Sequence, residues 1–163
     1  MRRGAAKRAV GAALVFAALA ACKSGMLTDG ARLRDFATRY TAVWNSQNAA
    51  SVAAFFAEDG SLKINDGAPS VGREAITAAA QGFMTAFPDM VVAMDRVDGE
   101  GDHAIYRWTL TGTNTGPAGT GRSVRISGYE EWTFGADGLI AESKGHFDEA
   151  DYQRQLNSGT GGS

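Results

Sequence analysis

The chain has 163 residues, of which 44% are hydrophobic, and this is enough apolar material for the core of one domain. It carries 16 basic and 18 acidic residues. Four of the basic residues (Arg2, Arg3, Lys7 and Arg8) lie in an expected leader, so 12 basic and 18 acidic residues remain in the mature protein, a net charge near −6. This balance argues against nucleic-acid binding, which usually needs a basic patch.

Residues 1–21 predict a bacterial lipoprotein signal peptide. Basic residues come first, and residues 9–21 then form an apolar run shorter than the roughly 20 residues that a membrane-spanning helix needs. The run ends at Cys22 in a Leu-Ala-Ala-Cys string that resembles the lipobox of bacterial lipoproteins. We therefore expect cleavage before Cys22, lipidation of that residue and attachment to the cell envelope outside the cytoplasm. The alternative is a cleaved signal followed by an incidental cysteine.

The residues that follow Cys22 indicate which membrane the protein would be attached to and how far the domain would lie from it. Lys23 follows it where an Asp would indicate retention at the inner membrane, and this mildly favours the outer membrane on the periplasmic side. Residues 22–28 are expected to be a short linker. Because Cys22 is the only cysteine, the chain contains no internal disulfide.

Residues 29–156 are expected to form one domain, followed by a disordered tail over 157–163. Apolar side chains recurring every three or four residues, together with capping and breaking residues, predict the helices. Alternating patterns and turn signals predict the strands. The expected helices cover 28–45 (starting at Thr28 or Asp29), 49–57, 73–86 and 149–156, and the expected strands cover 61–65, 90–97, 104–113, 123–134 and 139–148.

The last two strands are predicted to form a hairpin, because Asp137-Gly138 is a strong turn signal between two alternating runs. In the first run Glu130 shares a face with apolar residues, and Glu131 faces the other way. A solvated edge is the expected surrounding of both carboxylates, and the alternative is that one of them points inward. Polar residues gather on one side of the second run, which suggests either a half-wet pocket or an ordinary solvated face: Glu142, Lys144, His146 and Asp148.

Along the chain, most of the expected helices come before most of the expected strands. This order predicts an α+β domain, with a curled, mostly antiparallel sheet wrapped by three to four helices. Such a sheet encloses a blind cavity where small ligands commonly bind. Several aromatic residues are candidates for lining it, although large aromatic side chains more often belong to the plain core. The ligand-binding candidates are Trp44, Phe83, Phe87, Trp108 and Trp132, together with the polar residues Asn45 and Arg107.

Several short strings in their order resemble the SnoaL-like polyketide cyclase family of the nuclear-transport-factor-2-like superfamily. The resemblance covers about 29–156 and implies a cone-shaped α+β fold. It also implies that Asp148 acts as a general acid/base in an apolar cavity, where desolvation raises the pKa of a carboxylate. The strings are Trp44-Asn45, Gly72-Arg73-Glu74-Ala75-Ile76, Phe87-Pro88-Asp89, Gly101-Asp102, Arg107-Trp108, Gly112-Thr113, Asp137-Gly138, Glu142, Asp148 and Gln155-Leu156.

Two interpretations of Asp148 stay open, because it stands where a strand meets the last helix and could equally be the N-cap of that helix. His146 shares its strand face and could pair with it, although a lone histidine on a strand is more often structural. A metal site is not expected, since the one cysteine and two histidines lack ligand spacing, and no cofactor motif is present.

The function expected from these observations is the binding of a small apolar molecule, with isomerase, cyclase or hydratase chemistry through Asp148 as a possibility. The alternative is a non-catalytic binding or assembly module of the cell envelope. A homodimer is expected, and the alternative module would form it through the outer sheet face that carries Arg125, Tyr129 and Thr133.

Overall fold

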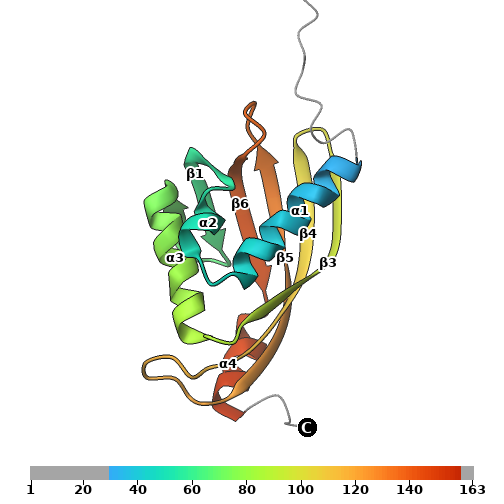
Figure 1. The fold of residues 1–163 in the computed structure, drawn as a ribbon. Helices are drawn as coiled ribbons and strands as arrows, with labels where there is room; N and C mark the ends of the chain where they lie inside the picture. The colour runs from blue at the N-terminus through green and yellow to red at the C-terminus, as the bar shows by residue number, and fades with distance from the viewer. Residues whose placement is uncertain (1–29, 159–163) are drawn as a thin grey trace, which may run out of the picture.

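The computed structural model describes residues 30–158 (Figure 1). Within that range the chain forms four helices and six strands. In chain order they are α1 (Gly30–Asn45), α2 (Ala49–Ala53), β1 (Phe56–Ile64), β2 (Ser70–Val71), α3 (Arg73–Ala86), β3 (Val91–Glu100), β4 (His103–Thr113), β5 (Ser123–Phe134), β6 (Ile140–Phe147) and α4 (Glu149–Ser158).

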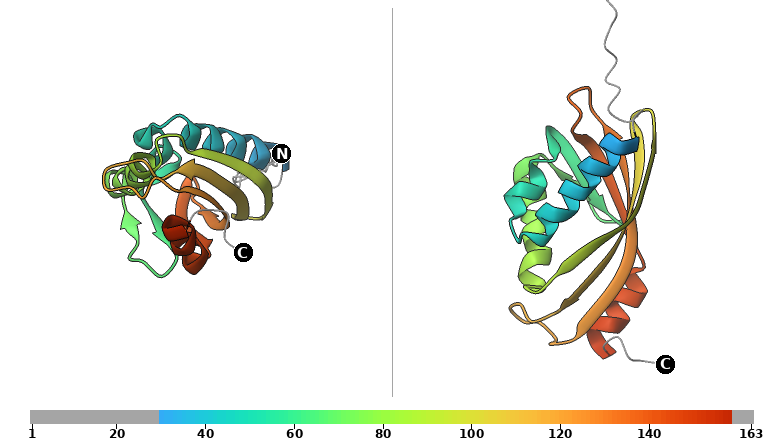
Figure 2. Two further views of the ribbon diagram at one scale, coloured as in Figure 1. Left: turned by 90° about the horizontal axis from the view of Figure 1, so that it is seen from below. Right: turned by 45° about the vertical axis from the view of Figure 1, so that its right-hand side comes forward.

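All six strands belong to one sheet in the order β2-β1-β6-β5-β4-β3. Neighbouring strands are antiparallel except β1 and β6, which run parallel. The sheet curls around the helices α1, α2 and α3, and α4 lies at the lower end of the molecule beside β5 (Figures 1 and 2). The expected α+β fold with a curled, mostly antiparallel sheet is therefore confirmed.

The helices α1 and α3 each carry an apolar stripe, and this stripe faces the sheet. In α1 the stripe includes Phe36 and Tyr40, both buried. The helix α3 has the predicted bounds: it starts after Gly72, whose φ of 82° suits a glycine, and it ends just before Phe87 and Pro88. Both helices therefore place aromatic and aliphatic side chains against one face of the sheet.

Several predicted boundaries were wrong. The second helix ends at Ala53 instead of residue 57, because Phe56 pairs with Ile140 at the start of β1. Phe56 is buried as expected, but in a strand. The short strand β2 was not expected, β3 continues to Glu100, and α4 extends to Ser158 into the segment expected to be disordered.

The hairpin of β5 and β6 has the predicted turn, and β5 places its apolar residues on the inner face. The alternation breaks at the start of β6, where Ile140 is fully buried although its spacing places it on the same side as Glu142, Lys144 and His146. The reason is a register shift between Thr133 and Phe134. From Ser143 onwards the inner face follows the prediction.

The predicted signal peptide, the lipidated Cys22, the linker and the helix start at Thr28 or Asp29 lie outside the described residues, as does the tail after Ser158. None of the helices between Gly30 and Ser158 is long and apolar enough to cross a membrane.

Candidate functional site

A cavity of about 60 Å³ lies between the inner face of the sheet and the helices α1 and α3. The helices α1 and α3 contribute to its wall through their apolar stripes, and five strands contribute through their inward-facing positions. Ten of the lining residues are apolar or aromatic, and the other two are Gly145 and Glu130. The aromatic ones are Trp44, Phe83, Tyr106, Trp108 and Phe147, and the aliphatic ones are Leu62, Ile64, Val92, Leu110 and Ile126.

Glu130 is the one acidic residue among the lining residues, and only 7% of it is exposed. Its Oε2 atom accepts hydrogen bonds from the Ser143 hydroxyl at 2.7 Å, the Trp132 indole N–H at 2.8 Å and the Tyr40 hydroxyl at 3.1 Å. Its Oε1 atom has only a longer contact of 3.4 Å with Tyr40. One carboxyl oxygen is therefore fixed by three donors, and the other retains capacity to bind a ligand.

Burial raises the pKa of Glu130 above its ordinary value, and the hydrogen bonds from Trp132, Ser143 and Tyr40 lower it in part. Burial, followed by the charge of Glu130, also raises the pKa of Tyr40, so its hydroxyl stays protonated and donates. A carboxyl group with a raised pKa exchanges its proton closer to neutral pH, as a general acid or base requires.

The expectation of a solvated edge for Glu130 was wrong. Residues of β5 alternate between the two faces, and Glu130 stands on the inner face between Ile126 and Trp132, which are both buried. Arg107 and Arg125 are both exposed, so neither is buried beside this carboxylate. An acidic residue within an otherwise apolar alternating stripe was the signal that could have identified it.

Trp108, which lines the same cavity, carries a second buried polar atom. Its indole Nε1–H is inaccessible to solvent and has no hydrogen-bond partner among the described residues. The indole ring packs against Gly128, the residue of β5 that pairs with Trp108. A Cβ atom at Gly128 would come within 2.6 Å of the ring, so the glycine leaves the space that the ring needs. Tyr106 pairs with Glu130, so Trp108 and Glu130 are diagonal neighbours on the inner face.

Three of the predicted ligand-binding residues, Trp44, Phe83 and Trp108, line the cavity. Phe87 and Trp132 are buried in the adjoining core, and Trp132 stacks on Tyr106 with 4.8 Å between ring centroids. Their contribution is therefore to packing and, for Trp132, to holding Glu130.

The two polar ligand-binding candidates lie elsewhere. Arg107 is exposed and contacts Asp98 with 3.4 Å between Nη1 and Oδ2. Asn45 connects α1 to β3, since its amide donates to the Val92 carbonyl at 2.9 Å and its Oδ1 accepts from the Val92 N–H at 2.7 Å. Neither lines the cavity.

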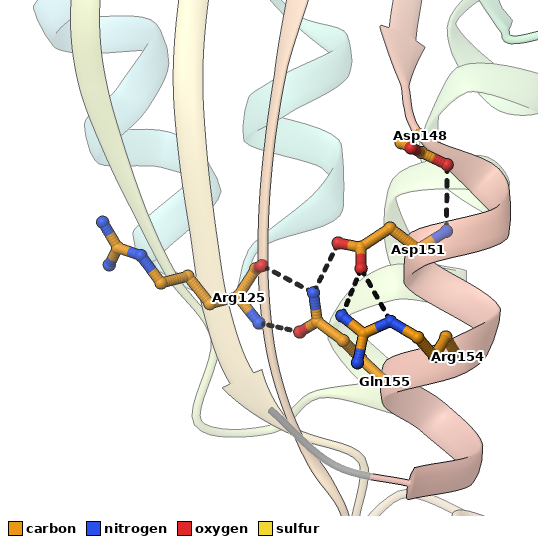
Figure 3. A network of polar contacts seen from close by, with 5 residues as sticks. All are labelled: Arg125, Asp148, Asp151, Arg154 and Gln155. Carbon is orange, nitrogen blue, oxygen red and sulfur yellow. Dashed lines mark hydrogen bonds and ion pairs between the residues drawn. The ribbon is translucent and has the colours of Figure 1, made fainter. Parts of the chain in front are cut away.

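Asp148 is exposed at the start of α4, where its Oδ1 accepts the Asp151 N–H at 2.9 Å (Figure 3). This is the geometry of a helix N-cap. In the same helix the Gln155 amide bonds the backbone N–H and carbonyl of Arg125 and so fastens α4 to β5 (Figure 3).

His146 lies on the outer sheet face, stacked on Tyr129 with 4.7 Å between ring centroids. His146 and Asp148 both border an open depression of about 770 Å³, which shares Ile64 and Phe147 with the wall of the apolar cavity. The structure thus brings the two together, and their catalytic role stays a prediction. Across residues 30–158, no group of three or more His, Cys, Asp or Glu side chains is arranged to hold a metal ion.

Comparison with known proteins gives a family match and a large set of similar structures. The sequence model of the SnoaL-like polyketide cyclase family matches residues 34–156, a range that includes every lining residue of the cavity. No curated protein matches the sequence.

Among solved structures, TsrD from Streptomyces laurentii is 23% identical with a TM-score of 0.69, over 80% of this chain and 98% of that one. A protein with a ketosteroid isomerase-like fold from Catenulispora acidiphila, in complex with trimethylamine, is 18% identical with a TM-score of 0.67, over 76% and 92%. The epoxide hydrolase/cyclase-like enzyme SalBIII is 16% identical with a TM-score of 0.65, over 76% and 95%. These likenesses show the fold, and they confirm the cone-shaped architecture expected from the sequence.

Proposed function

Since this chain belongs to the SnoaL-like polyketide cyclase family, we propose that its inner cavity binds a small, largely apolar molecule and that Glu130 performs acid/base chemistry on it. The observation that carries the proposal is the arrangement of the Glu130 carboxyl group. Three donors hold Oε2, and Oε1 is left for a ligand within an apolar wall.

The proposed chemistry follows from burial. A carboxylate surrounded by apolar side chains has lost its water, so it is a stronger base than an exposed one and exchanges protons nearer to neutral pH. Isomerisation, cyclisation or hydration at a carbon next to a carbonyl group needs such a base and afterwards an acid. SalBIII, which shares the fold, is described as an epoxide hydrolase/cyclase-like enzyme involved in pyran ring formation.

The size of the cavity limits the ligand. A water molecule needs roughly 10–15 Å³ measured in the same way, so the space of about 60 Å³ takes a compact molecule or one end of a larger one. The family resemblance instead predicts Asp148 as the acid/base group. Glu130 is buried and Asp148 is exposed, so separate variants distinguish them.

The test begins with native mass spectrometry of residues 23–163, expressed without the leader, and extraction of any bound small molecule. The compound found, or a small ketone in its absence, is then titrated by ligand-observed NMR. We expect Gly145→Leu to abolish binding, because Gly145 lines the cavity and a Cβ atom there meets only ordinary contacts of 3.5 Å or more. Glu131→Gln, on the exposed outer face, is the matched control for Glu130→Gln.

The outcomes separate the hypotheses. Turnover lost in Glu130→Gln and kept in Asp148→Asn supports Glu130, and the opposite pattern supports Asp148. An empty protein that binds no small molecule and runs as a clean dimer would favour the non-catalytic module. Tyr129, which is 38% exposed on the outer face, would then be the first residue to vary at the dimer contact.

We also propose that Cys22 is lipidated and tethers the domain to a membrane outside the cytoplasm. The support is the order of basic residues, apolar run and Leu-Ala-Ala-Cys string in the sequence. Expression of the full chain in a bacterium should give a membrane-associated protein whose N-terminal peptide carries a diacylglyceryl group. Cys22→Ser should release it, and a membrane-associated Cys22→Ser protein would contradict the tether.

A further inference from the structure

The proposed function leaves unused one buried polar group that belongs to a lining residue of the cavity, the indole N–H of Trp108. Buried hydrogen-bonding groups in native proteins are nearly always paired, so each unpaired one calls for a specific explanation. Trp108 Nε1 is inaccessible to solvent and unpaired among the described residues, and its residue lines the cavity that contains Glu130.

The position of the indole is fixed by its surroundings. Gly128 on the neighbouring strand provides the space for the ring, since a Cβ atom there would come within 2.6 Å of it. Phe147, another lining residue, packs against it edge-on with 6.3 Å between ring centroids. A donor held in this way loses little conformational freedom when it meets a ligand, and such preorganisation favours binding.

We propose that Trp108 donates its indole hydrogen bond to a carbonyl oxygen of the ligand, and that the site therefore selects small carbonyl compounds over hydrocarbons of the same shape. This inference rests on the proposed function of the cavity. An indole N–H donates and never accepts, so its partner must be an acceptor. A carbonyl oxygen fits because it accepts without adding a donor that the aromatic wall would leave unpaired.

Glu130 and Trp108 together define how such a ligand is oriented. They are diagonal neighbours on adjacent strands of the inner face, so one small molecule can reach both. With the carbonyl oxygen at Trp108, the carbon beside the carbonyl group faces toward Glu130. Trp108 is thus a positioning and specificity residue, and it is distinct from the group that exchanges the proton.

The test uses two probes of nearly equal shape, cyclopentanone and methylenecyclopentane, which differ by an oxygen in place of a CH₂ group. Affinities are measured by ligand-observed NMR on residues 23–163. We expect the wild-type protein to prefer the ketone by roughly five- to tenfold, the effect of one hydrogen bond. Trp108→Phe should remove this preference and leave the affinity for methylenecyclopentane within about twofold.

Trp44→Phe is the matched control. Trp44 lines the same cavity, but its indole nitrogen is not among the buried side-chain atoms of residues 30–158 that lack a hydrogen-bond partner. This variant should therefore keep the preference for the ketone. Circular dichroism and thermal unfolding check that both variants are folded.

A measurement on the wild-type protein keeps the test decisive if Trp108→Phe does not fold. The chain has three tryptophans, so three indole N–H signals are expected in a ¹⁵N-correlated NMR spectrum. Cyclopentanone should shift the Trp108 signal downfield, and methylenecyclopentane should not.

Equal affinity for the two probes, or a preference that persists in Trp108→Phe, overturns the role of Trp108 and leaves the cavity proposal standing. If neither probe binds while the molecule extracted from the protein does bind in the cavity and lacks a carbonyl group, the inference also fails alone. If no ligand binds at all, the proposed function fails first.

Discussion

Two carboxylates on one hairpin behave differently because of where the strands place them. Glu130 points from β5 into the apolar core and is surrounded by three donors. Asp148 follows β6, faces solvent and holds the first turn of α4. The same chemical group is thus an internal acid in one region and a helix cap in the other. The difference shows that depth in the fold, more than residue type, sets the surroundings of each carboxylate.

The largest effect is expected from Glu130→Ala. It would leave the Tyr40, Trp132 and Ser143 donors unpaired in the core, and each unpaired buried group costs about 1–3 kcal/mol. We expect the free energy of unfolding to fall by about 3–5 kcal/mol in urea denaturation. Glu131→Ala on the exposed face should change it by less than about 0.5 kcal/mol. Similar effects of the two variants would contradict the assigned depth of Glu130.

A somewhat smaller effect is expected from Gly128→Ala, which tests how tightly the inner face is packed. The added Cβ atom would come within 2.6 Å of the Trp108 ring and would also press on the backbone of His146. Overpacking of this kind typically costs about 1–3 kcal/mol. Gly145→Ala is the matched variant, because its Cβ atom would have contacts of 3.5 Å or more. Thermal unfolding of both variants measures the difference.

The pH dependence of stability gives a test of the buried acid alone. The folded state raises the pKa of Glu130, so the folded protein holds this proton more tightly than the unfolded chain does. The corresponding stability is fully present below the ordinary Glu pKa of 4.5 and is lost as the pH rises through the raised value. The stability of wild type relative to Glu130→Gln should therefore decline with rising pH across that window. Urea denaturation at a series of pH values measures this difference in the free energy of unfolding. If Glu130 were solvated, the difference between wild type and Glu130→Gln would not change with pH.

The smallest effects are expected at the outer carboxylate. Asp148→Ala should cost about 1 kcal/mol through the lost N-cap. Asn is as good an N-cap as Asp, so Asp148→Asn should stay within about 0.3 kcal/mol of wild type. Thermal unfolding of the two variants measures the stabilities. A loss in Asp148→Asn as large as in Asp148→Ala would show that the negative charge, and not the cap geometry, matters at this position.

Much of the fold could be predicted from local patterns. The helix α3 was predicted with its bounds because an apolar stripe runs from Arg73 to a stop at Pro88, and the hairpin followed from Asp137-Gly138. The start of β1 could not be predicted in this way. Phe55 and Phe56 continue an apolar pattern that suits a helix, and only the pairing of Phe56 with Ile140, far along the chain, makes a strand of it.

The aromatic residues that line the cavity could be predicted from the sequence, but the buried carboxyl group could not. Trp44, Phe83 and Trp108 were named because aromatic residues on inward faces meet in a curled sheet. Glu130 was assigned to a solvated edge because acidic side chains are rarely buried without partners. Its partners come from α1, β5 and β6, and no local pattern reveals that Tyr40, Trp132 and Ser143 meet around one oxygen.

The parallel pairing of β1 with β6 has a consequence for how the protein folds. Leu62 pairs with Ser143, 81 positions later in the chain, whereas the other long strands pair with their neighbours in sequence. Contacts between distant segments form slowly, because a long loop must close before they gain any stability. The antiparallel strands β3 to β6 can therefore assemble first as a meander. The segment with β1 and its helices joins afterwards, so closure of the cavity should be the last step of folding.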